Sequence, residues 1–405
     1  MHPRCLHRSF RPLVAGLVAL LAPLPAHALF RFNEGRDQVF VTAYIGTGYD
    51  SNVFANKNPS ADLVMSGGAG MEYARKSGLI GVNASLGWDF GNFASYSSED
   101  FLNPSASLEL TKATGRTTGA LQVNAARNSR ADPTVGLRTE SWNYGTNLNY
   151  RYPIMDRYSV AGNIGWDRTD YQDEGATLVD LEAYTIGTDL FYSWRSDRDL
   201  LAGYRYRLSE TSATSQGRDD SLYLGVSGRI LGKLSGTARA GWTFHKNTYP
   251  RDTTLPDLVT RVTEDSSDGL YVDLSGAWPV SKKITFLLSL GQDFSTTSTN
   301  FQTESSSVNL EGKFSHTVKL SSNAHAGAGY TNYISGFVDN TPVFTPGFRG
   351  GSREDYYVTA GVGASYVFNN HFTLSATYTY YENWSSLSNF TFVRHSIGLT
   401  LSTRW

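Results

Sequence analysis

From residue 39 onward, apolar and polar side chains alternate one by one through many segments of the chain. The first such segment is residues 39–46, VFVTAYIG, and a later one is residues 358–368, VTAGVGASYVF. A period of two residues indicates a β-strand with one apolar face and one polar face. Because this pattern recurs along the whole chain, the sequence predicts an all-β protein.

Short turns and longer polar loops separate these segments in regular alternation. The short turns are rich in the Gly, Asn, Asp, Ser and Pro residues that β-hairpins require. They are predicted at residues 75–78, 113–115, 153–156, 196–198, 231–233, 281–283, 319–321 and 369–371. Longer loops are predicted at residues 50–60, 128–138, 172–179, 246–267 and 336–352. This alternation predicts about eighteen antiparallel strands, a number typical of bacterial transmembrane barrels.

The apolar faces of the predicted strands end in aromatic residues. One face finishes with Trp88 and Phe90, and another finishes with Trp242 and Phe244. Aromatic residues collect where strands cross the boundary between lipid and water. No stretch after the first 28 residues approaches twenty consecutive apolar residues, so a membrane-spanning helix is not expected. The pattern therefore favours a transmembrane antiparallel β-barrel over a soluble sandwich, because only a closed sheet satisfies the backbone of every strand in lipid.

The last predicted strand, residues 390–405, alternates apolar and polar residues and ends on an aromatic side chain. Its apolar face carries Ile397, Leu399, Leu401 and Trp405. This ending resembles the C-terminal insertion signal of bacterial outer-membrane barrels. The resemblance implies that barrel-assembly machinery recognises this strand. It also implies that the protein lies in the outer membrane of a Gram-negative bacterium, in contact with lipid and lipopolysaccharide.

Residues 1–28 have the organisation of a cleaved secretory signal peptide. Arginines at the start are followed by a short apolar segment and by a small-x-small cleavage site, Ala-His-Ala, at residues 26–28. The single cysteine of the chain, Cys5, lies in this segment, so no disulfide is expected in the mature protein. The predicted domains are the signal peptide, residues 1–28, and one outer-membrane barrel, residues 29–405.

Charge and composition exclude several classes of function. Charged residues make up 18% of the chain and the formal net charge is −2, so nucleic acid is not an expected partner. The sequence contains no nucleophile elbow, no zinc-ligand spacing and no phosphate-binding loop. We therefore predict a protein that is not an enzyme, with no catalytic residue, no metal site and no cofactor.

Inward-facing positions of the predicted strands carry charges in two groups. The basic group is predicted to line the pore from four consecutive strands with Arg195, Arg205, Arg207, Arg229 and Arg239. The acidic group is predicted to line the strands on either side with Glu72, Asp89, Glu109, Asp273, Asp293 and Glu311. Opposed basic and acidic walls would create a field across the lumen that selects charged solutes. The alternative is that these charges pair across neighbouring strands and stabilise the wall.

Inward-facing tyrosines suggest a second way to bind a solute. They are Tyr44, Tyr223, Tyr271, Tyr357 and Tyr381. Aromatic rings along a pore can stack on the faces of sugar rings and guide an oligosaccharide. Tyrosine is also common in β-strands for reasons of packing alone, and this is the alternative to sugar stacking.

Residues 46–54, GTGYDSNVF, close the first predicted strand. This stretch is similar to the opening motif G-Y-D-x-N-V-[FY] of the beta-barrel porin 2 family. Members of that family are outer-membrane barrels, and many are linked with exopolysaccharide biosynthesis and export. The resemblance implies an outer-membrane barrel that translocates a secreted exopolysaccharide, and it assigns no catalytic or ligand-binding residue. An ordinary loop start with Asx turns would show the same Asp-x-Asn pair.

Three functions are consistent with these features. The first is a translocation pore for a secreted exopolysaccharide, which would need a periplasmic export partner at the short turns. The second is a general or solute-selective diffusion porin, and the third is a surface-display barrel that transports nothing. A barrel of about eighteen strands is wide enough for an aqueous lumen unless loops fold into it. The two longest predicted loops, residues 246–267 and 336–352, are the expected infolding segments.

Replacing two arginines of the basic group together, as Arg205→Ala with Arg207→Ala, should shift ion selectivity towards cations, because two positive charges leave the lumen. The reversal potential in a planar lipid bilayer under a salt gradient measures this shift. An unchanged reversal potential would leave these arginines with a structural role only.

Overall fold

The computed structural model describes residues 30–75, 78–172, 178–249, 263–335 and 353–405, so the predicted signal peptide lies outside the described residues. Within this part of the chain, every strand belongs to one antiparallel sheet in which consecutive strands pair. The last strand, β19, pairs with β2, so that eighteen strands form a closed ring. A short additional strand, β1, pairs with the start of β2.

The bounds of these elements follow the alternating segments of the sequence. The strands are β1 (Phe30–Phe32), β2 (Asp37–Asp50), β3 (Asp62–Arg75), β4 (Gly81–Phe93), β5 (Phe101–Lys112), β6 (Thr118–Asp132), β7 (Leu137–Met155), β8 (Tyr158–Tyr171), β9 (Leu181–Arg195), β10 (Arg198–Thr211), β11 (Gln216–Leu231), β12 (Leu234–Tyr249), β13 (Thr263–Pro279), β14 (Ile284–Thr296), β15 (Gln302–Ser315), β16 (Leu320–Ser335), β17 (Arg353–Val367), β18 (Phe372–Ser385) and β19 (Phe392–Arg404). Short 3-10 helices are η1 (Asn33–Gly35), η2 (Ser97–Glu99) and η3 (Ser388–Phe390). None of the helices in the described ranges is long and apolar enough to cross a membrane.

The predicted fold class, an all-β transmembrane antiparallel barrel of about eighteen strands, is confirmed. The predicted short turns coincide, to within a few residues, with the connections at one end of the barrel. Barrels of this class have short periplasmic turns and longer outer loops, so we call this end periplasmic and the opposite end outer.

Two predicted loops are wrong in extent. In place of a loop at residues 128–138, β6 continues to Asp132 and β7 begins at Leu137, because the cross-strand ladder persists to the turn and outweighs the polar composition. The two ends of the predicted loop 246–267 are also strand, up to Tyr249 and from Thr263. Its centre, like the predicted loop 336–352, lies outside the described residues.

The outward face of the ring is apolar and exposed. Leu224, Val362 and Ile186 expose 70%, 57% and 56% of their surfaces. Apolar exposure spread over a whole ring is unfavourable in water and is what lipid requires. Exposed aromatic side chains flank this band, with Trp88, Trp242 and Tyr356 towards the outer end and Trp194, Trp278 and Phe368 towards the periplasmic end. The chain is therefore an integral outer-membrane protein.

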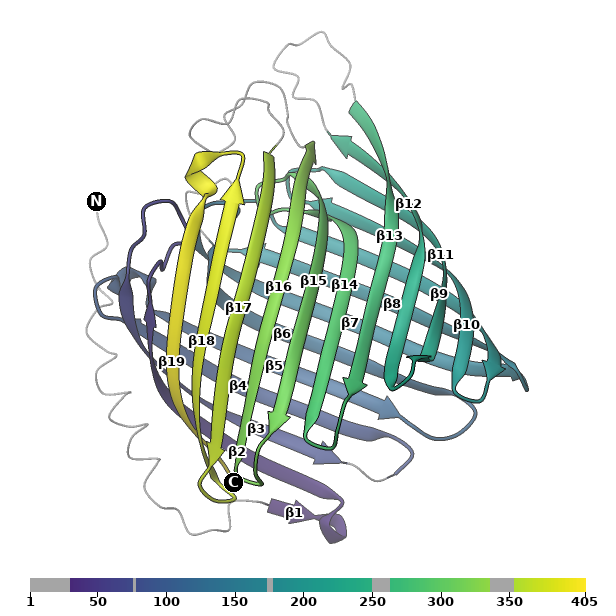
Figure 1. The fold of residues 1–405 in the computed structure, drawn as a ribbon, viewed down its shortest axis with the longest axis horizontal. Coiled ribbons are helices and arrows are strands. Elements are labelled where there is room, and N and C mark those ends of the chain that lie inside the picture. Colours follow the sequence, from purple (N-terminus) through teal and green to yellow (C-terminus); the bar gives the residue numbers. More distant parts are fainter. Residues whose placement is uncertain (1–29, 76–77, 173–177, 250–262, 336–352) are drawn as a thin grey trace.

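The ring is sharply bent at one edge. In Figure 1 the near wall contains β14–β19, the strands β3–β9 cross behind it at a different slope, and β10–β13 lie at the edge between them. Although two strands separate β11 from β14 in the ring, the two approach each other closely. The bend therefore brings inner faces of β10 and β14 together, which positions the charged residues described below.

The residues that resemble the family motif join the first strand of the ring to the last. Asp50 of β2 accepts hydrogen bonds from Arg394 of β19, at 2.5 Å from Nη2 to Oδ2 and at 3.0 Å from Nε to both oxygens. The Asn52 side chain is fully buried and donates to the carbonyl oxygen of Val393 at 3.3 Å. Val53 is fully buried beside it. The motif thus stabilises the seam at which the barrel closes.

Arg394→Ala should weaken this seam. The variant leaves Asp50, whose side chain is only 14% exposed, without its charged partner, and such a loss costs about 1–3 kcal/mol. We expect the folded barrel to lose its compact mobility on unheated gels at a lower temperature than the wild type. Arg218→Ala is the control, because its ion pair with Asp220 lies within one strand. An equal shift in both variants would contradict the role of this contact in closure.

Candidate functional site

The outer mouth of the barrel is crossed by the short turn between β6 and β7, residues 133–136. The ladder between β5 and β6 ends at Ala126 and the ladder between β7 and β8 ends at Ser141, so the tip of the β6–β7 hairpin beyond these residues leaves the wall. Arg353 of β17 donates to the carbonyl oxygens of Thr134 at 3.1 Å and of Pro133 at 3.4 Å. Because β17 belongs to the near wall and β6 to the far wall in Figure 1, this turn bridges the two walls.

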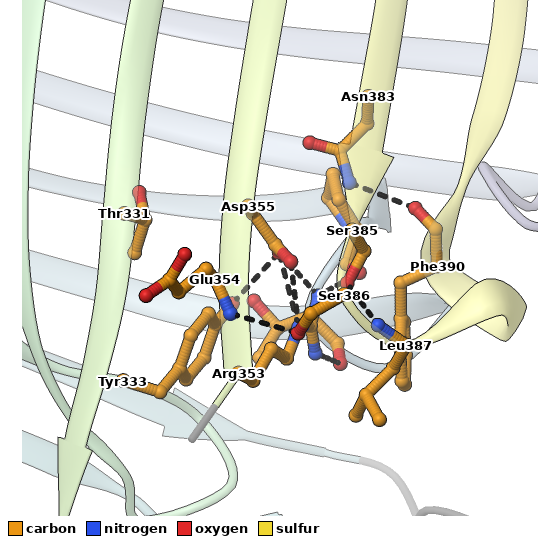
Figure 2. A network of polar contacts seen from close by, with 12 residues as sticks. Thr331, Tyr333, Arg353, Glu354, Asp355, Asn383, Ser385, Ser386, Leu387 and Phe390 are labelled. Carbon is orange, nitrogen blue, oxygen red and sulfur yellow. Dashed lines mark hydrogen bonds and ion pairs between the residues drawn. The ribbon is translucent and has the colours of Figure 1, made fainter.

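Arg353 is held in a single geometry, as Figure 2 shows. Its side chain is buried and forms an ion pair with Asp355, at 2.6 Å between Nη2 and Oδ2. The ring centroids of Phe390 and Tyr333 lie 3.7 Å and 4.5 Å from the guanidinium carbon, and the Tyr333 hydroxyl donates to Asp355. A guanidinium that is paired and stacked in this way is geometrically fixed. We call this arrangement the Arg353 latch.

Other outer connections fold inward and meet the β6–β7 turn. Ser298, in the turn between β14 and β15, donates to Asp132 at the end of β6 at 3.2 Å. Asn56, in the loop between β2 and β3, donates to the carbonyl oxygen of Gly136 at 3.1 Å. The turn between β10 and β11 is hydrogen-bonded to the β14–β15 turn. We call these four connections the mouth turns, and together they bridge the outer mouth.

Sequence reasoning missed the mouth turns as closing elements. It placed the infolding in residues 246–267 and 336–352, whose centres lie outside the described residues. Three of the mouth turns are short and the β2–β3 connection is one of the longer loops, but the contacts of all four join residues far apart in the sequence, so no local pattern reports them. The glycine at position 136 does indicate a tight turn, since its φ of 69° lies in the left-handed region that favours glycine. It does not indicate what the turn contacts.

Three of the predicted pore-lining arginines are paired with aspartates at the bent edge. Arg205 and Arg207 on β10 both contact Asp293 on β14, at 2.6 Å and 3.3 Å. Arg239 on β12 contacts Asp273 on β13 at 2.6 Å and Asp189 on β9 at 3.1 Å, so three aspartates face three arginines. These guanidinium groups therefore present little uncompensated charge to the lumen. The pairing agrees with the alternative that the charges stabilise the wall.

The other predicted charges lie elsewhere on the ring and also have partners. Their contacts are Arg229 with Asp197 (3.4 Å), Arg195 with the ring of Trp194 (4.8 Å), Glu72 with Arg404 (2.8 Å), Asp89 with the hydroxyl of Tyr44 (2.8 Å), Glu109 with Asn83 (3.3 Å) and Glu311 with Lys313 (3.7 Å). Arg195 and Arg229 lie at the periplasmic ends of their strands, away from the paired arginines. The basic group is thus not one continuous wall, and its pore-lining role stays a prediction.

The five predicted lumenal tyrosines lie in three separate places. Tyr223 and Tyr271 stack at the bent edge with ring centroids 4.8 Å apart, and each ring also has an arginine against it. Tyr357 and Tyr381 stack on each other at 5.7 Å near the outer end. Tyr44 is hydrogen-bonded on the wall between β2 and β4. The rings do not form one continuous track, and sugar stacking on them stays a prediction.

The inner faces of β4–β8 carry mainly amide and hydroxyl groups. They include Asn83, Ser85, Ser107, Gln122, Asn124, Asn147, Asn149 and Asn163. Asn163 donates to Asn149 at 2.8 Å and to Asn147 at 3.2 Å. A cavity of about 470 Å³ lies between this surface and the paired arginines of the bent edge. The lumen therefore combines mainly neutral polar groups, beside Asp89 and Glu109, on one side with paired charges on the other.

The predicted insertion residues Ile397, Leu399 and Leu401 lie on the outward face of β19 and are exposed. Trp405 stacks on His371 with ring centroids 4.0 Å apart. Recognition of these residues by assembly machinery stays a prediction.

Comparisons with known proteins give structural similarity at low sequence identity. No family model and no curated protein matches the chain. The chain is similar to OpdK of Pseudomonas aeruginosa, solved with vanillate, at 12% identity and a TM-score of 0.47, covering 91% of this chain and 99% of OpdK. It is also similar to the FrpB iron transporter of Neisseria meningitidis (F3-3 variant), at 11% identity and a TM-score of 0.45, covering 85% of this chain. The chain spans 62% of the length of FrpB.

A bacterial polysaccharide outer membrane secretin aligns at 9% identity and a TM-score of 0.37, covering 90% of this chain and 98% of the secretin. Similarity at this level says nothing about what this chain transports. The architecture of an outer-membrane β-barrel rests on the strand pairing and on the apolar outer face described above.

Arg353→Ala should release the β6–β7 turn from β17 and widen the outer mouth. We expect the mean conductance of the purified barrel in a planar lipid bilayer to rise about twofold or more, because a bridge between the two walls is lost. Removing one member of a buried ion pair costs about 3–5 kcal/mol, so the double variant Arg353→Leu with Asp355→Leu is measured beside it.

Arg168→Ala serves as the control for the latch, because its ion pair with Asp170 lies within β8 and away from the mouth turns. Its conductance should equal that of the wild type. Unchanged conductance in both latch variants, with the compact gel mobility of a folded barrel, would show that Arg353 does not close the mouth.

Proposed function

We propose that this barrel is an outer-membrane channel that translocates a secreted exopolysaccharide of low charge. The proposal rests on the inner surface, where aspartates compensate the arginines of the bent edge and the facing wall offers amides and hydroxyls. Sugar hydroxyls both donate and accept hydrogen bonds, so they match such side chains. A strongly charged solute would have to displace an existing ion pair to gain a partner of its own.

Because the mouth turns bridge the outer mouth, the proposed channel is gated. Passage of a polymer requires the Arg353 latch to release the β6–β7 turn. A ligand shifts such an equilibrium only when it binds the open form more tightly than the closed form. The polymer itself, or a periplasmic export partner at the short turns, would supply this difference in binding free energy.

A surface-display barrel that transports nothing is the second candidate. The packed mouth turns and the paired lumenal charges favour it, because both stabilise a barrel whose interior stays closed. A general or solute-selective diffusion porin has less support, since it requires an open path at rest and the mouth turns bridge the outer end.

The test is to record currents from the purified wild type and from Arg353→Ala in planar bilayers, with and without neutral oligosaccharides. We expect small or intermittent currents from the wild type and larger currents from the variant. The reversal potential should show at most a weak selectivity for cations under a salt gradient, since the bent-edge arginines are paired with aspartates and Asp89 and Glu109 have neutral partners. Neutral oligosaccharides should reduce the current while they occupy the lumen.

Each other result selects a different function. A steady wild-type current that sugars do not affect would establish a diffusion porin and contradict translocation of a polysaccharide. The absence of current from both proteins, with folded barrels in the membrane, would favour the display barrel. Loss of surface polysaccharide in a deletion strain, restored by the wild-type gene, would support the export role directly.

A further inference from the structure

The cavity beside the bent edge is a space lined by side chains on the inner face of the barrel. Its volume is about 470 Å³, which lies in the range of about 300–1,000 Å³ that small-molecule sites occupy. Gly187 of β9 forms part of its lining, and a Cβ atom added there would meet no other atom closer than 3.8 Å. The missing side chain at this position therefore contributes to the open volume.

One side of the cavity is lined by side-chain amides. Asn163 of β8 donates to Asn149 of β7 at 2.8 Å, and Asn149 donates to Asn147 at 2.5 Å. An amide has two donor hydrogens and an acceptor oxygen with two lone pairs. These contacts therefore orient the amides and leave them further hydrogen-bonding capacity.

The other side of the cavity is lined by Arg151, Arg205, Arg239 and Asp189, each of which forms an ion pair, Arg151 and Arg205 with aspartates outside the lining. Asp189 accepts a hydrogen bond from the Tyr223 hydroxyl at 2.7 Å and pairs with Arg239 at 3.1 Å. Arg151 pairs with Asp199 at 2.7 Å and lies over the ring of Phe191 at 4.3 Å. Donors and acceptors thus lie close together on this side, and their charges are compensated.

We propose that this cavity is a binding subsite for one or two residues of a neutral oligosaccharide. Neighbouring hydroxyls of a sugar ring donate and accept at the same time, which suits the amides on one side and the Asp189 and Arg151 pairs on the other. An anion would compete with the aspartates for their arginines, and a cation would compete with the arginines, so the ion pairs disfavour both. The subsite rests on the proposed function and specifies its substrate class.

The test is to fill the cavity and measure sugar binding. Gly187→Leu places a side chain in the open space of β9. The matched control is Gly291→Leu on β14, a strand that does not line the cavity: Gly291 aligns with the inward-facing Asp273, and an added Cβ would meet nothing closer than 4.0 Å. A second variant, Asn149→Ala with Asn163→Ala, removes the amides without filling the cavity.

Binding is measured on the whole mature barrel in detergent, by saturation-transfer NMR and titration calorimetry. The probes are neutral glucan hexamers with α and with β linkages, and an acidic galacturonate hexamer. We expect a neutral hexamer to bind the wild type and the Gly291→Leu control equally. The dissociation constant should rise by about tenfold or more in Gly187→Leu and in the double asparagine variant.

Because this measurement needs neither a membrane nor an open mouth, its outcome is separate from that of the channel recordings. No binding of any neutral hexamer, equal affinity in Gly187→Leu and the wild type, or tighter binding of the acidic hexamer would each overturn the subsite. Loss of neutral-hexamer binding only in the cavity variants, while no protein carries current in a bilayer, would support the subsite and contradict translocation. If sugars block the current of Gly187→Leu and of the wild type equally, the channel is supported and the subsite is contradicted.

Discussion

A strand in a bilayer meets no water, so its backbone groups are satisfied only if the ring of strands closes completely. Among the described strands, every ladder but one joins strands that follow each other in the chain and can form as local hairpins. The exception is the ladder from β19 to β2, which is held at its outer end by Asp50 and Arg394 and at its periplasmic end by paired backbone groups of Val41 and Trp405. The family-like motif lies at this seam, so its residues serve closure of the barrel.

The same closed ring determines how charge is arranged inside it. The bend at β10–β13 narrows the lumen, and a guanidinium in a narrow, partly dehydrated space is stabilised only by a close counter-charge. Arg205 and Arg207 accordingly share Asp293 from across the bend. The facing wall of β4–β8 carries mainly amide and hydroxyl groups. Two chemically different surfaces therefore face each other inside one continuous sheet.

The period of two residues was sufficient to predict the strands, their inward faces and the closed barrel, because successive side chains of a strand point alternately to its two faces. This alternation predicts an inward direction for Arg205, Asp293 and Tyr223. It could not predict that Arg205 and Asp293 meet, because their contact depends on the bend of the ring. Arg353 and Thr134 were missed for the same kind of reason: their hydrogen bond joins opposite walls, and neither residue lies in a local pattern that reports it.

Two ladders stop well before their strands end, at Ala126 between β5 and β6 and at Val272 between β13 and β14. The β7–β8 pairing persists to Ser141, and the Gln172 N–H donates to the carbonyl oxygen of Glu140; beyond Glu140 the tip of the β6–β7 hairpin has no ladder to β5 or β8, so this point acts as a hinge. Swinging the hairpin about it breaks side-chain contacts at the mouth and leaves the backbone pairing within the lipid intact. In the proposed gated channel, the free energy of opening would thereby be separate from the free energy that holds the barrel in the membrane, and permeability would change without loss of the fold.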